Sequence, residues 1–163
     1  MDSINNMSDF LKLNAKTFLV TGVSNKKSVA YFVAQGLKEA GAKTIFSVQS
    51  AEHLARMEKL FPEDRAYLLD VENEAAVLEF GATLARDGYK LDGLVHSIAF
   101  ANYSEGMKPF HETNLKDYLQ ANTISCFSLT MLARALKDSF NPEASVVTIS
   151  ISNTRATNYG YMG

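Results

Sequence analysis

The chain has 163 residues, a formal net charge of −2 at pH 7 and a hydrophobic content of 47%. That length fits one domain, residues 1–163, and the hydrophobic share is ample for one core. The small net charge and the lack of a basic run argue against nucleic-acid binding, and no apolar stretch is long enough to span a membrane. Because the first residues lack the charged and apolar regions of a signal peptide, we expect a cytoplasmic protein.

Cysteine and histidine are too sparse for a metal centre. Cys126 is the only cysteine, and its position in an apolar helical stretch predicts a buried structural thiol. His53, His96 and His111 show no spacing typical of metal ligands. We therefore expect no metal and no internal disulfide.

The first regular elements are predicted to be a strand, a glycine turn and a helix, after a lead-in over residues 1–15. Residues 17–21 are a β-branched and aromatic run too short for a helix, and Gly22 ends it. Apolar residues then recur at three- and four-residue spacing from Ser28 until Gly41, the expected helix stop. The positions that share this spacing are Val29, Phe32, Val33, Gly36, Leu37 and Ala40.

The turn between this strand and this helix suits a nucleotide phosphate. The first turn of a helix carries unpaired backbone N–H groups and a partial positive charge, and Gly22 would let a ligand approach the main chain. Ser28 is expected in that first turn, with the small Ala30 letting the helix lie close to the strand. The usual G-x-G-x-x-G spacing is missing, however. Helix capping by Ser24, Asn25 and Ser28 is therefore an equally good interpretation of the local sequence.

The rest of the chain alternates predicted strands and helices. Further strands are expected over residues 43–48, 65–69, 91–98 and 145–150, and further helices over 51–60, 74–86 and roughly 114–140. This alternation predicts an α/β fold, a doubly wound parallel sheet with strand order three-two-one-four-five. The last helix is apolar nearly all round, so we expect it to form a homo-oligomer interface around Ile124.

In a doubly wound sheet, ligands bind beyond the carboxyl ends of the strands, where the strand order reverses. Five residues stand at or just past predicted strand ends: Gly22, Gln49, Asp70, Ser97 and Ser150. They would share one edge of the sheet, where a dinucleotide could lie across them.

Several segments together resemble the bacterial NADH-dependent enoyl-acyl-carrier-protein reductases, a divergent branch of the short-chain dehydrogenases/reductases with a Rossmann fold. The segments are residues 21–30, 70–71, 92–101, 124–129 and 158–163. The sequence His-Ser-Ile-Ala-Phe-Ala at residues 96–101 is the most specific of them. The resemblance covers almost the whole chain from Lys16 onward.

The resemblance implies an oxidoreductase of fatty-acid biosynthesis that transfers a hydride from NADH to a trans-2-enoyl thioester on acyl carrier protein. It implies that Tyr159 is the catalytic tyrosine that stabilises the enolate. The implied cofactor-binding residues run from the pyrophosphate through the ribose and adenine to the nicotinamide: Gly22, Ser28, Val29, Gln49, Asp70, Val71, Ser97, Ile98 and Ala99. The implied substrate-binding residues are Phe100, Ala101 and Met162. Taken singly, Asp70 could be only a strand-end cap and Ser97 only a satisfied buried hydroxyl.

The C-terminal end departs from the family pattern. Family members have a lysine soon after the catalytic tyrosine, whereas this chain stops at Gly163, so we expect a C-terminally incomplete fold with an active-site tail at residues 151–163. Ile151 stands where members commonly have tyrosine, and the spacing to Tyr159 is shorter. Two hypotheses remain: a reductase, possibly inactive as this chain, and a non-catalytic nucleotide-binding or interaction module. A ketone-reducing relative fits the motif at residues 96–101 less well.

The residues after the second predicted strand bear on the choice of cofactor. An acidic side chain there normally binds both ribose hydroxyls, whereas an arginine favours a 2′-phosphate. Here the neutral Gln49 comes first, Glu52 follows and Arg56 lies further along. We therefore expect a preference for NADH over NADPH.

Overall fold

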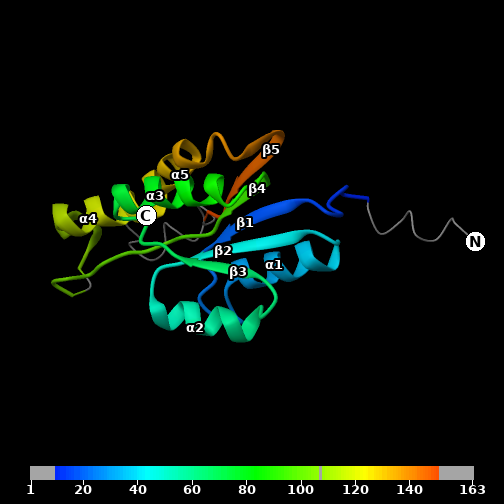
Figure 1. Ribbon diagram of the computed structural model, residues 1–163. Helices are drawn as coiled ribbons and strands as arrows, with labels where there is room; N and C mark the ends of the chain where they lie inside the picture. The colour runs from blue at the N-terminus through cyan, green and yellow to red at the C-terminus, as the bar shows by residue number, and fades with distance from the viewer. Residues whose placement is uncertain (1–9, 107, 151–163) are drawn as a thin grey trace, which may run out of the picture.

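The computed structural model of the protein describes residues 10–106 and 108–150. It shows a five-stranded parallel sheet in the order β3-β2-β1-β4-β5, with α1 and α2 on one face and α3, α4 and α5 on the other (Figure 1). The predicted doubly wound sheet and its strand order are confirmed. The order reverses between β1 and β4, which places the expected ligand site at their carboxyl ends.

The helices and strands follow the predicted alternation. The strands are β1 (Thr17–Thr21), β2 (Lys43–Val48), β3 (Arg65–Leu68), β4 (Leu91–His96) and β5 (Phe140–Thr148). The helices are α1 (Val29–Glu39), α2 (Ala51–Leu60), α3 (Glu74–Arg86), the 3-10 turn η1 (Phe110–Glu112), α4 (Leu115–Asn122), the π-helix η2 (Thr123–Phe127) and α5 (Ser128–Leu136).

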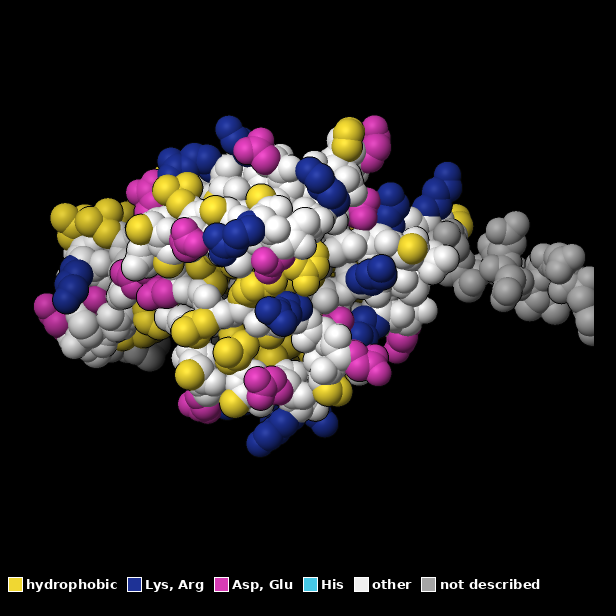
Figure 2. Space-filling view, in the orientation of Figure 1, with side chains coloured by type: hydrophobic (Ala, Val, Ile, Leu, Met, Phe, Trp, Pro, Cys, Tyr) yellow, Lys and Arg dark blue, Asp and Glu magenta, His cyan; other side chains and the backbone are white. Residues whose placement is uncertain are grey.

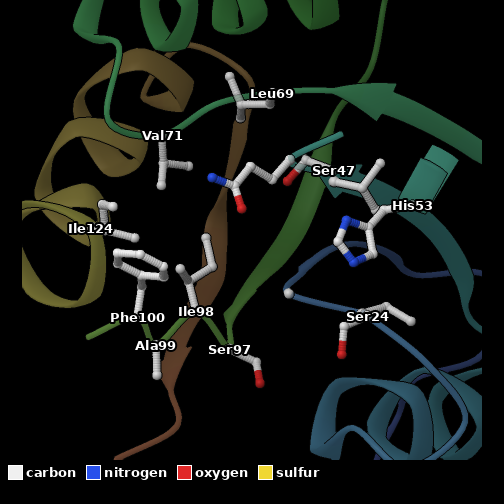
Figure 3. A pocket seen from close by; sticks show the side chains of 14 residues that line it. Ser24, Ser47, His53, Leu69, Val71, Ser97, Ile98, Ala99, Phe100 and Ile124 are labelled. Carbon is white, nitrogen blue, oxygen red and sulfur yellow. The ribbon is translucent and has the colours of Figure 1, made fainter. Parts of the chain in front are cut away.

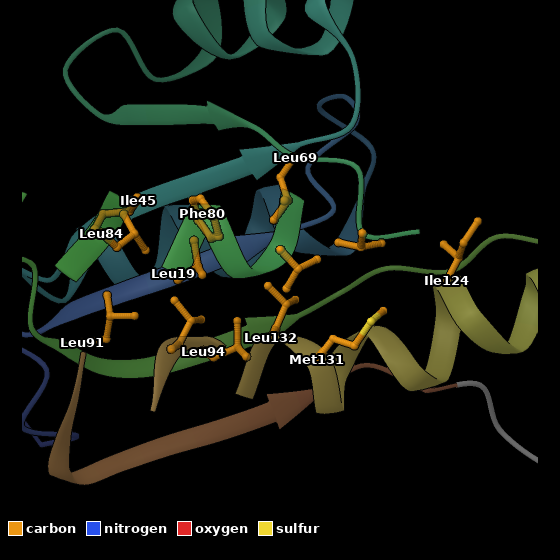
Figure 4. Close-up of a cluster of buried hydrophobic side chains, with 13 residues drawn as sticks. Leu19, Ile45, Leu69, Phe80, Leu84, Leu91, Leu94, Ile124, Met131 and Leu132 are labelled. Carbon is orange, nitrogen blue, oxygen red and sulfur yellow. The ribbon is translucent and has the colours of Figure 1, made fainter. Parts of the chain in front are cut away.

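A hydrophobic core lies on each face of the sheet. Leu19 of β1 faces the layer of α3 and α5, whereas its neighbour Val20 faces the layer of α1 and α2. Both are fully buried. This two-sided burial explains why the central strands are continuous apolar runs rather than alternating ones. Figure 4 shows the first core, in which Leu94, Leu132 and their neighbours fill the space between sheet and helices.

Helix α1 turns to the sheet a face that matches the predicted one only in part, since Val33 and Leu37 pack against the core as predicted. Its buried residues are Ala30 and Ala34, whereas Val29 and Phe32 are 53% and 61% exposed. The predicted apolar spacing was therefore wrong in part, because small side chains let the helix approach the sheet and the larger ones are left outside. The predicted stop is confirmed: Gly41 has a φ of +83°, and its N–H donates to the carbonyl of Lys38 at 2.9 Å.

The predicted helix over residues 114–140 was too long. It is divided into α4, η2 and α5, and it ends at Leu136. Strand β5 then begins at Phe140, which pairs with Leu91, while Ser145 pairs with Gly93. The residues between Phe140 and Ser145 form a bulge, which is why Pro142 is tolerated in a strand.

The apolar face of this helical segment is only partly buried. Ile124, Leu132 and Leu136 are buried, whereas Phe127 is 54% exposed. Cys126 is exposed as well, so the prediction of a buried thiol was wrong: the π-helical turn directs this position away from the core. Figure 2 shows hydrophobic side chains gathered over α4, where Leu115 is 69% exposed.

The described part of the chain contains neither a metal-binding cluster nor a membrane-spanning helix. No group of histidine, cysteine, aspartate and glutamate side chains there is close enough to hold a metal ion. Within the same residues, no helix has the length and apolar character needed to cross a membrane.

Candidate functional site

A cavity of about 190 Å³ lies at the carboxyl ends of β1, β2, β3 and β4 (Figure 3). It is at the point where the strand order reverses, as expected for a ligand site in this type of sheet. Its lining residues are Gly22, Val23, Ser24, Ser47, Val48, Gln49, His53, Leu69, Val71, Ser97, Ile98, Ala99, Phe100 and Ile124. Seven of them were predicted from the sequence: Gly22, Gln49, Val71, Ser97, Ile98, Ala99 and Phe100.

Gly22, at the end of β1, lies very close to the main chain of Ser97, which follows β4. Its φ is +81°, and a Cβ at this position would lie 1.8 Å from the carbonyl oxygen of Ser97. Thr21 fixes the same junction, since its hydroxyl donates to the carbonyl of Val95 and accepts from the N–H of Ser97, both at 3.2 Å. Only glycine combines this backbone angle with this close approach. Where Gly22 lines the cavity, main-chain atoms are therefore exposed to it without a side chain.

The loop after Gly22 leaves the first turn of α1 open. Ser28 is the residue just before the helix rather than within its first turn, and its hydroxyl donates back to the carbonyl of Asn25 at 2.8 Å. Asn25 in turn accepts from the N–H of Lys27 at 2.7 Å. Helix α1 thus has no side-chain cap, and the capping interpretation of these residues was wrong. Ser28 and Val29 stand at the end of this loop and do not line the cavity.

The other α-helices of the described residues that follow a strand of this edge are capped. Ser50 accepts from a backbone N–H at the start of α2, and Asn73 does so for α3. Uncapped N–H groups at the start of a helix are donors that an anion can satisfy. The open start of α1 is therefore the best place in this edge of the sheet for a phosphate group.

One end of the cavity is polar. Ser24, Ser47 and His53 lie there, on the opposite side from Val71, Ile124 and Phe100 in Figure 3. Gln49 also lines the cavity, as predicted, and its side chain is exposed. Sequence reasoning missed His53 as a lining residue, because it considered His53 only as a metal ligand and found no suitable spacing.

Arg56 is closer to the site than its position in the sequence suggested. Its guanidinium donates to the carbonyl of Ser24 and to the carboxylate of Glu52, both at 2.6 Å. It therefore ties helix α2 to the loop after β1. Its charge is paired with Glu52 one helical turn away.

The other end of the cavity is apolar and is formed by the segment just after β3 and by η2. Leu69, Val71 and Ile124 are all buried and suit the flat face of a base. Asp70, which was predicted beside them, is exposed, and its carboxylate accepts from the N–H of Glu72 at 3.0 Å. Asp70 thus acts as a strand-end cap in this structure, and it does not line the cavity.

The loop after β4 connects this cavity to a second one. Ile98, Ala99 and Phe100 line both, while Ala101, Cys126 and Ser150 line only the second. Ser125 of η2 holds the loop: its hydroxyl accepts from the N–H of Phe100 at 2.9 Å and donates to the carbonyl of Phe100 at 3.0 Å. Tyr159 and Met162, predicted to act here, lie outside the described residues.

His96 joins β4, β5 and α5 beneath this loop. It is fully buried, with Nε2 at 2.8 Å from the Ser128 hydroxyl and Nδ1 at 3.3 Å from the Thr148 hydroxyl. Ser128 uses its own hydrogen on the carbonyl of Ile124, so Nε2 must carry the donated proton and Nδ1 must accept from Thr148. Burial lowers the pKa of His96, which keeps the ring neutral as this arrangement requires.

Comparison with known proteins shows which family shares this sequence. Residues 22–163 match the family model described as "Enoyl-(Acyl carrier protein) reductase". The NADPH-type enoyl-acyl-carrier-protein reductase of Staphylococcus aureus is 33% identical over 94% of this chain, and the NADH-type enzyme of Enterococcus faecalis is 34% identical over 93%. The chain spans 62% of the length of each of these relatives.

A solved structure gives the same result. The Bacillus cereus enoyl-acyl carrier protein reductase, determined with NADP⁺ and indole naphthyridinone, matches with a TM-score of 0.85 and 30% identity, over 91% of this chain and 60% of that one. The sheet, the cavity at its switch point and the sequence similarity agree. This chain therefore belongs to the enoyl-acyl-carrier-protein reductase family.

Proposed function

We propose that the protein is an enoyl-acyl-carrier-protein reductase of fatty-acid synthesis, and that the cavity at the carboxyl edge of the sheet binds its NADH. The observation that carries the proposal is the close approach of Gly22 to Ser97 beside the uncapped start of α1. Together they present main chain without a side chain, beside a helix start that has no side-chain cap, at the switch point of the sheet. A dinucleotide needs this combination at its pyrophosphate.

The remaining cofactor contacts follow from the two ends of the cavity. The apolar pair Leu69 and Val71 would hold the adenine, and Gln49 at the polar end would hold the adenosine ribose. Ser97, Ile98 and Ala99 continue toward the second cavity and would line the path to the nicotinamide. One relative has an NADPH-type name and another an NADH-type name, so the relatives do not decide the cofactor preference. We propose that this chain prefers NADH over NADPH because Gln49 is neutral.

The bound cofactor would supply the hydride for the β-carbon of a trans-2-enoyl thioester on acyl carrier protein. The chain's own contribution is to place the acceptor: Phe100 and Ala101 lie at the second cavity, next to the expected nicotinamide position.

We propose that Tyr159 stabilises the enolate. We also propose that the exposed apolar side chains over α4 and η2 join subunits. The rest of a substrate site would be supplied by the part of the fold that the longer relatives have.

A cofactor titration tests the proposal. Ala99 is exposed and lines both cavities, so Ala99→Trp would fill the nicotinamide path without disturbing the core. We expect it to weaken NADH binding at least tenfold, measured by the fluorescence of bound NADH. The matched control is Ala75→Trp, at an exposed alanine of α3 away from the cavity, which should bind NADH like the wild type. Equal binding by both variants would place the cofactor elsewhere.

A second measurement separates a reductase from a non-catalytic binding module. NADH oxidation with crotonyl thioester should be measured on the longest product of the gene that can be expressed. We expect turnover that Tyr159→Phe abolishes, whereas the 163-residue chain alone should bind NADH with negligible turnover. Binding without turnover in the longest product would support the module instead.

A further inference from the structure

The loop after β4 is held against α4 and η2 at every second residue from Phe100 to Ser104. Three polar side chains of these helices each bond one loop residue: Ser125 bonds Phe100, Gln120 bonds Asn102 and Asp117 bonds Ser104. Ala101 lies between the first two bonded residues and lines the second cavity. The position of this part of the cavity wall therefore depends on hydrogen bonds on both sides of Ala101.

Asp117 makes the largest number of these hydrogen bonds. Its Oδ2 atom accepts from the N–H and the hydroxyl of Ser104, at 2.8 and 2.9 Å, and from the side-chain amide of Asn114 at 3.0 Å. Asn114 is the N-cap of α4, and its own Oδ1 accepts from the backbone N–H of Asp117 at 2.8 Å. Carboxylate, cap and loop thus form one connected set of hydrogen bonds, which fixes Ser104 relative to the start of α4.

The Asp117 carboxylate is buried and charged, with only 2% of the residue exposed. Burial by itself raises the pKa of Asp117, but the hydrogen bonds from Ser104 and Asn114 lower it below its ordinary value. The other carboxylate oxygen, Oδ1, is buried and has no hydrogen-bond partner among the described residues. Such an oxygen costs stability, and a local cost of this kind is typical of functional sites rather than of ordinary loops.

We infer that Asp117 is a positioning residue, which acts through Ser104 to fix Ala101 and so sets the shape of the second cavity, where the acyl thioester would bind. This inference rests on the proposed function. Phe100 is held separately, because the Ser125 hydroxyl bonds both its N–H and its carbonyl. Loss of the Asp117 bonds would therefore loosen the loop beyond Phe100 and leave the nicotinamide path before it in place. The affinity for the acyl thioester should fall, and the affinity for NADH should not.

Steady-state kinetics on the longest product of the gene that can be expressed tests the inference, with crotonyl thioester as the acyl substrate. We expect Asp117→Ala to raise the KM for this thioester about tenfold and to leave the dissociation constant of NADH unchanged. The kcat should change less than the KM, because Asp117 lines neither cavity. Asp117→Asn keeps an acceptor oxygen for Ser104 and should restore most of the lost affinity.

A control variant separates positioning from a general loss of stability. Val77 is fully buried in α3 and lines neither cavity, so Val77→Ala should destabilise the fold without changing the KM. An unchanged KM in Asp117→Ala would overturn the inference. An equal rise of the KM in Val77→Ala, or in Asp117→Asn, would overturn it as well.

Failure of the proposed function has a different result. If the wild type does not turn over the crotonyl thioester, the reductase proposal fails, and the role of Asp117 in binding an acyl thioester fails with it. The loop contact itself is measured independently by hydrogen exchange at the backbone amide of Ser104. Asp117→Ala should accelerate this exchange and Asp117→Asn should not, because only the alanine lacks an acceptor. Equal exchange rates in the wild type and in Asp117→Ala would show that Asp117 does not hold the loop.

Discussion

The unit β1–turn–α1 and the helical segment from α4 to α5 border the same site, yet they acquire their shapes in different ways. The turn is fixed locally by Gly22, whose backbone angle and lack of a side chain let β1 meet β4. The helical segment has no such residue. Its π-helical turn coincides with polar contacts from distant parts of the chain, Ser125 with Phe100 and Ser128 with His96. The first region depends on one residue whose type the sequence shows directly, and the second depends on hydrogen bonds to distant segments.

The largest expected effect is at Gly22. Gly22→Ala would place a Cβ 1.8 Å from the Ser97 carbonyl on a residue with positive φ. We expect the free energy of unfolding in urea to fall by about 3 kcal/mol or more, since backbone strain and overpacking add. Gly88→Ala is the control, because Gly88 also has a positive φ but has open space around it. It should lose only about 1 kcal/mol. Equal losses would mean that the contact with Ser97 is not what requires glycine.

The next effect concerns the buried histidine below the helical segment. The pKa of His96 is lowered by burial, so between its folded and unfolded values the unfolded chain binds a proton that the folded chain lacks. Stability should therefore fall as the pH drops below about 6.5, with a contribution of up to about 1.4 kcal/mol per pH unit. Unfolding midpoints between pH 5 and 8 measure this slope. His96→Gln should flatten it, whereas His111→Gln, at an exposed position, should not. An unchanged slope in His96→Gln would remove His96 as its source.

The smallest effect tests whether distant contacts shape the π-helical turn. Ser125→Ala removes both hydrogen bonds to the main chain of Phe100, and we expect a loss of about 1 kcal/mol in urea unfolding. Cys126→Ala, at the adjacent exposed position, should stay within about 0.5 kcal/mol of the wild type. A loss at Cys126 as large as at Ser125 would show that this turn depends on its own side chains rather than on Phe100.

Much of the site was predictable because strand ends can be read from the sequence. Gly22, Gln49, Val71 and Ser97 each follow an apolar run, and parallel strands bring such positions to one edge. Asp70 shows the limit of that reasoning. It stands at the correct edge, but its carboxylate bonds the main chain of Glu72 and does not line the cavity. The pattern located the residue, while the direction of its side chain depended on the local turn.

Two of the lining residues that the sequence missed, His53 and Ile124, reach the site from helices. His53 and Ile124 are separated from the strand ends by helical turns, so their distance from the cavity depends on how α2 and η2 pack. Arg56 shows the same effect, since it bonds Ser24 across 32 positions of sequence. Helical periodicity gives a face, but it does not say which part of another element that face will meet.

The sequence by itself determined the alternation of strands and helices, the strand order and the glycine at the switch point, because these follow from apolar runs and from backbone angles that one residue controls. The tertiary structure decided the inner face of α1, the π-helical turn, the exposure of Cys126 and the approach of His53 and Arg56. These features depend on long-range packing and on buried hydrogen bonds such as those of His96. Their partners are fixed only when separate segments of the chain come together.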